Sequence, residues 1–460
     1  MVLSLFPQIA AVWLCLSIVN ATIAQTYHQK AEAYMNAAVA TWNFSGTVLV
    51  TRKGRIVYQN AKGLAVRESR IPNSINTKFR IGSVTKQFVA AIVLQLQEKG
   101  LLNVADTLGK FFPDFPRGNS ITIHQLLTHT SGVTNYTKPD KIEPGSLLGV
   151  PRSVDSLYKL LTNQPLDFAP GEKYSYSNGG YLLLGLIIEK ITAKKFELVL
   201  TENILKPAGM LNSGFERSND VISNRAFGYR YKEGQWKNFH YHQVDWAFTA
   251  GAMYSTVEDL HNWNTALLEG KILTKASRTK MWSGHATTGK NAGYGYGVEV
   301  DSYKNRPRIG HGGELVPFLS YSQYFLQEDA YLIVLANTDN VGAYRIGCDL
   351  AALLFDQPNQ TPHIYKEKKL TPEQLQKFVC SLKIDGRAMR IILKDVKLFR
   401  VFDDNPTNLL QLVPESASLL FYSDRDAQWE FVRNKEGRLV KVIYWFDGEK
   451  AQEITEVESK

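Results

Sequence analysis

The order of apolar and polar positions predicts strands at both ends of a long first region, with helices between them. Near its start, two runs rich in β-branched and aromatic residues, 47–51 and 56–58, flank a Lys53-Gly54 turn and predict a hairpin. Near its end, residues 331–336 form an apolar run of strand length before a predicted helix over 344–354. This order indicates an α+β domain, in which an antiparallel sheet lies beside a group of helices.

Three segments between these strands have the pattern of helices. Residues 85–99 are apolar around most of the helix circumference and stop at Gly100, which is typical of a buried helix ended by glycine. Residues 181–191 predict a second buried helix. The stretch 255–258, Ser-Thr-Val-Glu, has the spacing of a capping box and predicts the start of a third helix.

The pattern changes after residue 356. A polar, proline-bearing stretch over 357–369 has the composition of a linker. Beyond it, short strand-like runs alternate with turn residues, and they lie at 389–402, 409–413, 419–422, 429–432 and 439–446. Residues 370–460 are therefore predicted to form a separate small β domain, a barrel or half-barrel.

The N-terminal segment has the features of a targeting sequence. Residues 1–24 carry no charged side chain, 9–19 are mostly apolar, and Thr22-Ile23-Ala24 offers small residues for cleavage before Gln25. This predicts a signal peptide over 1–24 and an exported protein, periplasmic or extracellular. Because no Lys or Arg precedes the apolar stretch, an uncleaved membrane anchor is the alternative.

Composition and charge exclude several classes of function. The chain carries 53 Lys and Arg against 44 Asp and Glu, a net charge of +9, but the basic residues are scattered and predict no nucleic-acid binding. The excess is interpreted as a solvated basic surface, with weak attraction to anionic cell-envelope material as the alternative. Cys348 and Cys380 lie in predicted buried elements and are expected to be free thiols. No spacing suits a metal site, so neither a metal nor another cofactor is expected.

Ser83-Val84-Thr85-Lys86 places a nucleophile and a base one helical turn apart, at the start of the first buried helix. The backbone N–H of a serine there is one of the free donors that a developing oxyanion needs. Lys86 shares its face of the helix, and burial would favour the neutral, basic amine. Gly82 is expected to leave room for a substrate. The same spacing at 156–159 and 277–280 is interpreted as solvated helix surface.

Two further motifs extend this constellation. Tyr176-Ser177-Asn178 precedes the second buried helix, where a phenol could relay a proton and an amide could hold a substrate. Gly310-His311-Gly312-Gly313 precedes a predicted strand over 318–325, and its glycines would let a substrate backbone lie against the chain. Each motif alone is ordinary, but the three in this order indicate a serine hydrolase.

With these motifs in place, residues 27–356 resemble the serine β-lactamases and penicillin-recognising enzymes, in the class C-like branch that includes esterases and D-aminopeptidases. The blocks that share this resemblance lie at 102–106, 112–115, 123–132, 168–172, 205–210 and 250–256. The resemblance implies a β-lactamase/DD-peptidase-like fold, an antiparallel sheet flanked by helices with a helical subdomain. It also implies that His124 and His129 are hydrogen-bonded scaffold. Residues 370–460 resemble the lipocalin-like β domain often appended to this family.

The resemblance implies a role for each motif residue. These are Ser83 as nucleophile, Lys86 and Tyr176 as proton carriers, Asn178 as substrate holder, His311 with Gly313 as the third motif, and the backbone N–H of Glu314 as the second oxyanion donor beside that of Ser83. The substrate would be a small molecule or peptide, and the oligomeric state stays open.

One departure from the β-lactamases bears on the substrate. Their third motif carries a lysine that recognises a carboxylate, whereas this chain has His311, expected to be mostly neutral at pH 7 and charged near pH 6. The sequence therefore predicts an acyl-enzyme hydrolase of D-amino-acid peptides, esters, amides or β-lactams. A true β-lactamase is one alternative. A catalytically silent binding or scaffold protein is another, against which intact Ser83, Lys86 and Tyr176 count.

Overall fold

The computed structural model describes residues 26–137, 153–232, 234–239, 243–289, 291–340, 342–359, 361–363, 365–384, 386–422, 427–446 and 449–459. The predicted signal peptide lies outside these residues. Within them, no helix combines the length and apolar character needed to cross a bilayer. The chain divides into two compact units, one of residues 45–229 and 238–351, and one of the residues up to 44, 230–237 and 352–460.

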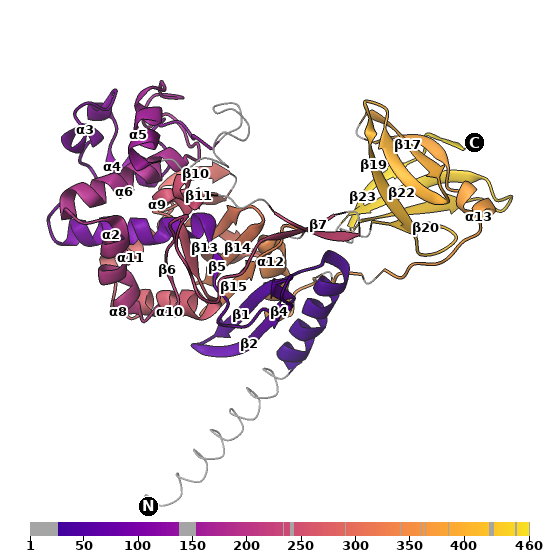
Figure 1. Ribbon diagram of the computed structural model, residues 1–460, viewed down its shortest axis with the longest axis horizontal. Coiled ribbons are helices and arrows are strands. Elements are labelled where there is room, and N and C mark those ends of the chain that lie inside the picture. Colours follow the sequence, from indigo (N-terminus) through magenta and orange to yellow (C-terminus); the bar gives the residue numbers. More distant parts are fainter. Residues whose placement is uncertain are drawn as a thin grey trace, which may run out of the picture. The chain divides into compact units, whose positions relative to one another are not determined.

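The first unit is built on an antiparallel sheet of eight strands (Figure 1). In spatial order these are β10 (Ala286–Gly289), β11 (Ala292–Tyr294), β12 (Glu299–Tyr303), β13 (Arg306–Leu315), β14 (Phe318–Phe325), β15 (Ala330–Ala336), β1 (Gly46–Arg52) and β2 (Arg55–Lys62). The predicted hairpin is β1–β2. Since β1 pairs with β15, the first and last strands of this unit meet inside the sheet.

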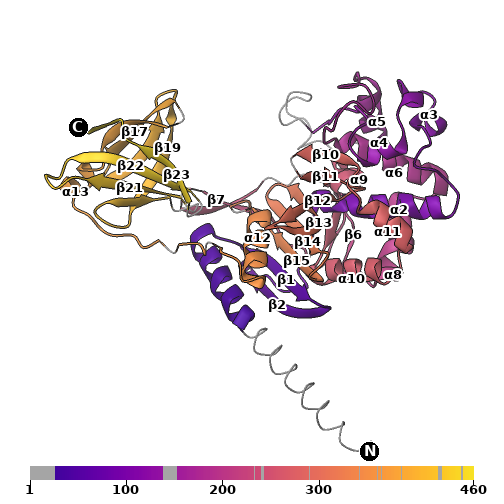
Figure 2. The ribbon, with the colours of Figure 1, turned by 180° about the vertical axis from the view of Figure 1, so that it is seen from behind.

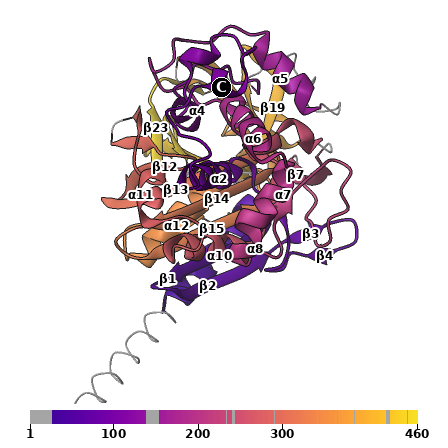
Figure 3. The ribbon, with the colours of Figure 1, turned by 90° about the vertical axis from the view of Figure 1, so that its left-hand side faces the viewer.

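Helices cover both faces of this sheet. On one face, α12 (Ala343–Leu354) lies against β14 (Figure 2). Gln323 of β14 donates there to the Gly347 carbonyl oxygen at 2.7 Å. On the other face lie α2 (Lys86–Glu98), α10 (Val257–Leu268) and α6 (Asn178–Thr192), with α2 in front of β13 and β14 in Figure 3. Side chains of α2, α6 and α10 share one apolar core with the sheet. The predicted α+β class is confirmed.

The ends of these helices follow from local chemistry. α2 ends at Glu98, and Gly100 has the positive φ, +69°, that a left-handed helix end requires. α6 is capped by Ser177, whose Oγ accepts from the Gly180 N–H. For α10 the predicted capping box is wrong, because only a single N-cap bond is present among the described residues, from the Asp259 N–H to the Thr256 side chain. Thr256 is its N-cap, and Ser255 instead belongs to strand β9.

The remaining elements of this unit are short. They include β3 (Leu64–Val66), β4 (Ile71–Pro72), β5 (Phe79–Arg80), β6 (Gly214–Phe215), β9 (Met253–Ser255), α3 (Leu108–Phe111), α4 (Ile123–Leu127), α5 (Val154–Thr162), α7 (Phe196–Leu200), α8 (Lys206–Ala208), α9 (Phe248–Gly251) and α11 (Lys275–Met281). β5, β9 and β6 form a small antiparallel sheet of their own. Because β5 ends at Arg80, this small sheet anchors the chain that leads to Ser83.

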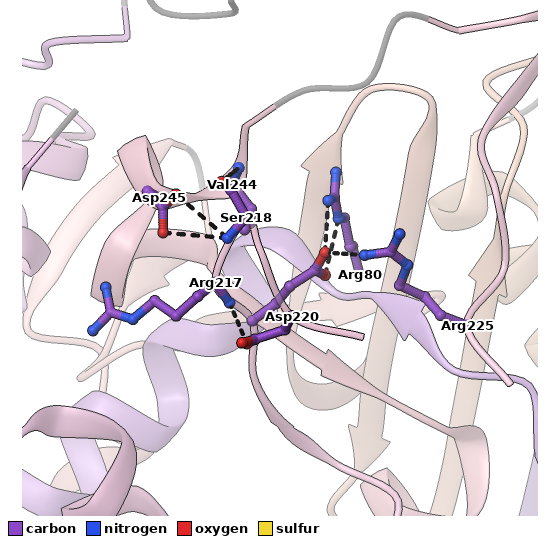
Figure 4. A network of polar contacts seen from close by, with 8 residues as sticks. Arg80, Arg217, Ser218, Asp220, Arg225, Val244 and Asp245 are labelled. Carbon is purple, nitrogen blue, oxygen red and sulfur yellow. Dashed lines mark hydrogen bonds and ion pairs between the residues drawn. The ribbon is translucent and has the colours of Figure 1, made fainter. Parts of the chain in front are cut away.

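A buried ion network holds β5 in place (Figure 4). The Arg80 guanidinium donates to both carboxylate oxygens of Glu216, at 3.0 and 2.6 Å, and Arg225 donates to the same carboxylate. The side chain of Glu216 is fully buried and that of Arg80 nearly so. Charges taken out of water need such pairing, so this network ties the segment before the nucleophile to the chain around 216–225.

The second unit is dominated by one antiparallel sheet of nine strands, β16–β24, that curls into a nearly closed barrel. The strands are β16 (Cys380–Ile384), β17 (Arg387–Lys394), β18 (Lys397–Phe402), β19 (Asn405–Pro414), β20 (Leu419–Phe421), β21 (Ala427–Arg433), β22 (Leu439–Phe446), β23 (Glu449–Ile454) and β24 (Val457–Ser459). The predicted barrel-like domain is confirmed. The single run predicted at 389–402 is two strands, because Asp395 and Val396 adopt positive φ and form a turn.

This unit also contains α13 (Pro372–Gln376), a helix over 26–42, and parts of β7 (Tyr229–Lys232) and β8 (Gln235–Asn238). Its apolar core is made by alternate inward-facing strand residues such as Met389, Ile391 and Trp429.

Cys348 and Cys380 are both free and buried, as predicted.

Candidate active site

Ser83 lies at the junction between β5 and α2. The chain forms a 3₁₀ turn over Gly82–Thr85 and continues into α2 at Lys86, so the nucleophile candidate sits one turn ahead of the α-helix. Its side chain is half-buried. Ser83 therefore stands at the positive end of the helix, partly open to solvent.

The Lys86 side chain is fully buried, and its Nζ contacts three oxygen atoms. They are Ser83 Oγ at 2.9 Å, Asn178 Oδ1 at 2.8 Å and the Ala250 carbonyl oxygen at 2.7 Å. Burial holds the pKa of Lys86 well below its ordinary value of 10.5. Asn178 Oδ1 and the Ala250 oxygen can only accept, so they suit the two hydrogens of a neutral amine and leave its lone pair for the Ser83 hydroxyl.

Tyr176 reaches the same oxygen from the other motif. Its phenol donates to Ser83 Oγ at 2.8 Å, and its ring lies 4.9 Å from Lys86 Nζ. Burial raises the pKa of Tyr176 well above its ordinary value of 10. The phenol is therefore protonated at neutral pH and points its proton at Ser83.

Asn178 begins α6 and has both ends of its amide engaged. Its Oδ1 accepts from Lys86, and its Nδ2 donates to Thr137 Oγ1 at 3.0 Å. This arrangement orients the amine of Lys86. Whether Asn178 also holds a substrate stays a prediction.

The third motif lies on β13, where the pairing of that strand changes. β12 pairs with β13 only as far as Gly310, while β14 continues to Leu315. His311 to Leu315 therefore have β14 on one side and no strand pairing on the other among the described residues. A strand edge of this kind can bind an extended substrate backbone.

Two glycines let β13 approach the nucleophile. A Cβ atom on Gly82, which has φ +49°, would lie 2.6 Å from the Glu314 backbone nitrogen. A Cβ on Gly313 would lie 1.9 Å from the Ile81 carbonyl oxygen. The space at Gly82 is thus occupied by the backbone of Glu314 and not reserved for a substrate. Both glycines let the backbone around Glu314 lie against residues 81 and 82, directly before Ser83, and this supports the Glu314 N–H as the proposed second oxyanion donor.

His311 is almost fully buried, with 2% of its surface exposed. Its Nδ1 lies 2.5 Å from the Gly312 carbonyl oxygen, so Nδ1 carries the proton and Nε2 accepts from the Tyr294 phenol at 2.8 Å. Burial and the nearby Lys86 lower the pKa of His311 to about 3. The expectation that His311 becomes charged near pH 6 is therefore wrong, because its ordinary pKa applies only to a solvated imidazole.

The other two serine–lysine spacings serve local structure. Ser156 Oγ donates to the Ser153 carbonyl oxygen at the start of α5. Ser277, in the first turn of α11, hydrogen-bonds the carboxylate of Glu98. Only Ser83 has its hydroxyl against a buried lysine among these three.

Two groups at this site escaped the sequence argument. The Ala250 carbonyl oxygen, on α9, accepts from Lys86, and Tyr294, at the end of β11, donates to His311. Residues 250–256 were identified as part of the family resemblance, but that resemblance indicated no role for the Ala250 oxygen. Tyr294 belongs to a tyrosine–glycine alternation, Tyr294-Gly295-Tyr296-Gly297, which was the available signal for the second.

Comparison with known proteins supports the resemblance. The family model described as Beta-lactamase matches residues 31–357. The penicillin-binding protein PbpX of Bacillus subtilis (strain 168) is 32% identical over 264 residues. This match covers 57% of this chain and 64% of PbpX, so the chain spans just under two thirds of that protein. Penicillin-binding protein 4* of the same strain is 27% identical over 431 residues, 87% of this chain and 93% of that protein. A D-stereospecific amidohydrolase from Streptomyces sp. is 25% identical, with a TM-score of 0.61 over 70% of this chain and 98% of that one.

Proposed function

The chain belongs to the beta-lactamase family of hydrolases, and we propose that it cleaves acyl bonds through an acyl-enzyme on Ser83. One observation carries this proposal: Ser83 Oγ lies within hydrogen-bond distance of both a buried lysine amine and a protonated tyrosine phenol. Burying the amine of Lys86 removes it from water, which destabilises the folded protein. A catalytically silent scaffold protein would have no function that requires this burial.

In the proposed first half-reaction, Ser83 Oγ attacks the substrate carbonyl carbon while its proton passes to the neutral amine of Lys86. The carbonyl oxygen becomes an oxyanion that accepts from the backbone N–H groups of Ser83 and Glu314. As the scissile bond breaks, the Tyr176 phenol gives its proton to the leaving nitrogen or oxygen, and Lys86 returns a proton to Tyr176. The product is a Ser83 ester and a free amine or alcohol.

Deacylation repeats these steps with water. The neutral amine of Lys86 takes a proton from the attacking water. As Ser83 leaves the second tetrahedral intermediate, the Tyr176 phenol gives its proton to Oγ and Lys86 returns a proton to Tyr176. The products are a carboxylic acid and the free enzyme, so all atoms and protons balance without a cofactor in the proposed scheme.

For the substrate, we propose D-amino-acid amides, peptides or esters. The Streptomyces amidohydrolase, D-stereospecific by its name, supports this choice. The neutral His311 in place of a charged lysine is a further argument, since a neutral group binds a carboxylate less strongly than an ammonium does. Export, from the predicted signal peptide, is consistent with the penicillin-binding protein relative, and we propose it as well.

A substrate panel tests this proposal. The full chain should be assayed with D- and L-amino-acid p-nitroanilides, short p-nitrophenyl esters, a peptide ending in D-Ala-D-Ala and a chromogenic cephalosporin. We expect D-configured amides or esters to have the highest kcat/KM, and the cephalosporin a value lower by tenfold or more. A cephalosporin that is turned over best would establish a true β-lactamase instead.

A further inference from the structure

His129 holds the segment that carries Tyr176 from both sides. It follows α4, and its Nδ1 accepts the backbone N–H of Ser177 at 3.1 Å, while its backbone oxygen accepts the N–H of Ser175 at 2.9 Å. Its ring lies 4.2 Å from the Tyr176 ring, centroid to centroid. One residue thus contacts the chain before Tyr176, the chain after it and the tyrosine ring itself.

The protonation state of this imidazole follows from its partners. Since Nδ1 accepts from an amide N–H, the single proton of the neutral ring must be on Nε2. Burial, with Lys86 and His311 nearby, holds the pKa of His129 well below its ordinary value of 6.5. The neutral form of His129 is therefore favoured, and the ring adds no charge beside the amine of Lys86.

The fold maintains His129 at a cost. Nε2 is buried and finds no hydrogen-bond partner among the described residues, and leaving a buried donor unpaired destabilises the fold. The backbone of His129 also has φ +60°, a left-handed conformation that residues other than glycine adopt infrequently. An apolar ring of similar size would avoid the first cost, so packing alone does not explain a histidine here.

We propose that His129 is a positioning residue that aims the phenol of Tyr176 at Ser83 and at the leaving group. The inference rests on the proposed function, in which Tyr176 delivers the leaving-group proton. The Nδ1 acceptor fixes the backbone after Tyr176 and so sets where its side chain points, while the ring at 4.2 Å adds a packing contact that is secondary to the acceptor. Losing the acceptor should let the phenol drift from the 2.8 Å geometry on which proton transfer depends.

Two substitutions separate these contacts. In His129→Asn, Oδ1 can still accept the Ser177 N–H, and asparagine tolerates the left-handed backbone. In His129→Phe, the ring remains and the acceptor is lost. His124→Asn is the matched control, because His124 lies on α4 five residues earlier and its Nδ1 bonds Tyr296, away from residues 175–177. If His129→Phe fails to fold, His129→Gly replaces it, since glycine also suits φ +60° and lacks the acceptor.

The readout is the ratio of kcat/KM for an anilide to kcat/KM for the p-nitrophenyl ester of the same acid, because kcat/KM reports acylation and not the deacylation step that both substrates share. Nitrophenolate leaves without a proton, whereas an amine leaving group needs one from Tyr176. We expect the variant that lacks the acceptor to lower this ratio tenfold or more, with KM nearly unchanged. His129→Asn and His124→Asn should keep the ratio within about threefold of the wild type.

If the variant without the acceptor loses activity equally on both substrates, the ratio stays unchanged. This result would show that His129 only supports the fold and would overturn the inference. A loss of the ratio in His129→Asn as large as in His129→Phe would also overturn it. The proposed function is tested separately by labelling of Ser83. If Ser83 is labelled and the ratio does not move, only the role of His129 fails.

Discussion

The backbone of Gly82 lies directly against that of Glu314, so close that a Cβ on residue 82 would come within 2.6 Å of the Glu314 nitrogen. Contacts this short between a Cβ and a backbone atom force the two segments apart. Gly82→Ala and Gly313→Ala should therefore displace the proposed second oxyanion donor and lower kcat about 100-fold or more, in line with the loss of one such donor.

Gly312 provides the matched control within the same motif. The nearest atom to a Cβ on Gly312 would be 3.8 Å away, in the Tyr321 ring, which is ordinary contact. Gly312→Ala should keep kcat within about threefold of the wild type. If all three variants lose activity alike, the close approach of Gly82 and Gly313 is not what positions the donor.

Lys86→Ala and Lys86→Arg should lose acylation to a similar extent, about a thousandfold. General bases contribute roughly 10²–10⁴-fold, and arginine stays protonated even when buried. The measurement is the single-turnover rate of Ser83 labelling by a fluorophosphonate. An arginine variant with a near-wild-type rate would exclude proton abstraction by Lys86.

The pH dependence of kcat/KM should report Lys86 and not His311. Lys86 acts as a base when neutral, and its pKa is depressed, so the rate should rise with pH and reach its plateau well below pH 10.5. His311, with a pKa of about 3, should add no change between pH 5 and 8. The preference for a free acid over its methyl ester should therefore stay constant over that range. A preference that grows as the pH falls towards 6 would show that His311 becomes charged.

The buried carboxylate of Glu216 should matter to stability more than any surface acid. Glu216→Ala leaves two guanidinium groups, those of Arg80 and Arg225, without the carboxylate they share, and removing one partner of a buried pair costs about 3–5 kcal/mol. Urea unfolding should show this loss. Glu197→Ala, which breaks the partly exposed pair with Arg217, should cost at most about 1 kcal/mol.

The residues of the site could be predicted from the sequence because each occupies a position with a local signature. Ser83 and Lys86 stand at the start of an apolar helix, Tyr176 and Asn178 at the start of another, and His311 among glycines before a strand. Helix periodicity, caps and glycines depend on neighbours a few residues away, so the elements that carry the site could be predicted for the same reason.

Contacts between distant segments could not be predicted in this way. The Ala250 oxygen is 164 residues from Lys86, and no spacing rule connects them. The protonation state of His311 depends on its burial by other elements and on the nearby Lys86, and the residues next to it in the sequence do not reveal either. The same limit explains Gly82, where the glycine was correctly singled out but the atoms that need its space, those of Glu314, come from a strand more than 200 residues later.

The most direct test of the central claim is the site of acylation. The full chain should be treated with a fluorophosphonate probe and, separately, with a fluorescent penicillin, and the adduct located by intact mass and peptide mapping. We predict one adduct per chain from the fluorophosphonate, on Ser83, absent from a Ser83→Ala variant with unchanged thermal stability. Labelling of Ser83→Ala at the wild-type level, or an adduct on another residue, would contradict the account.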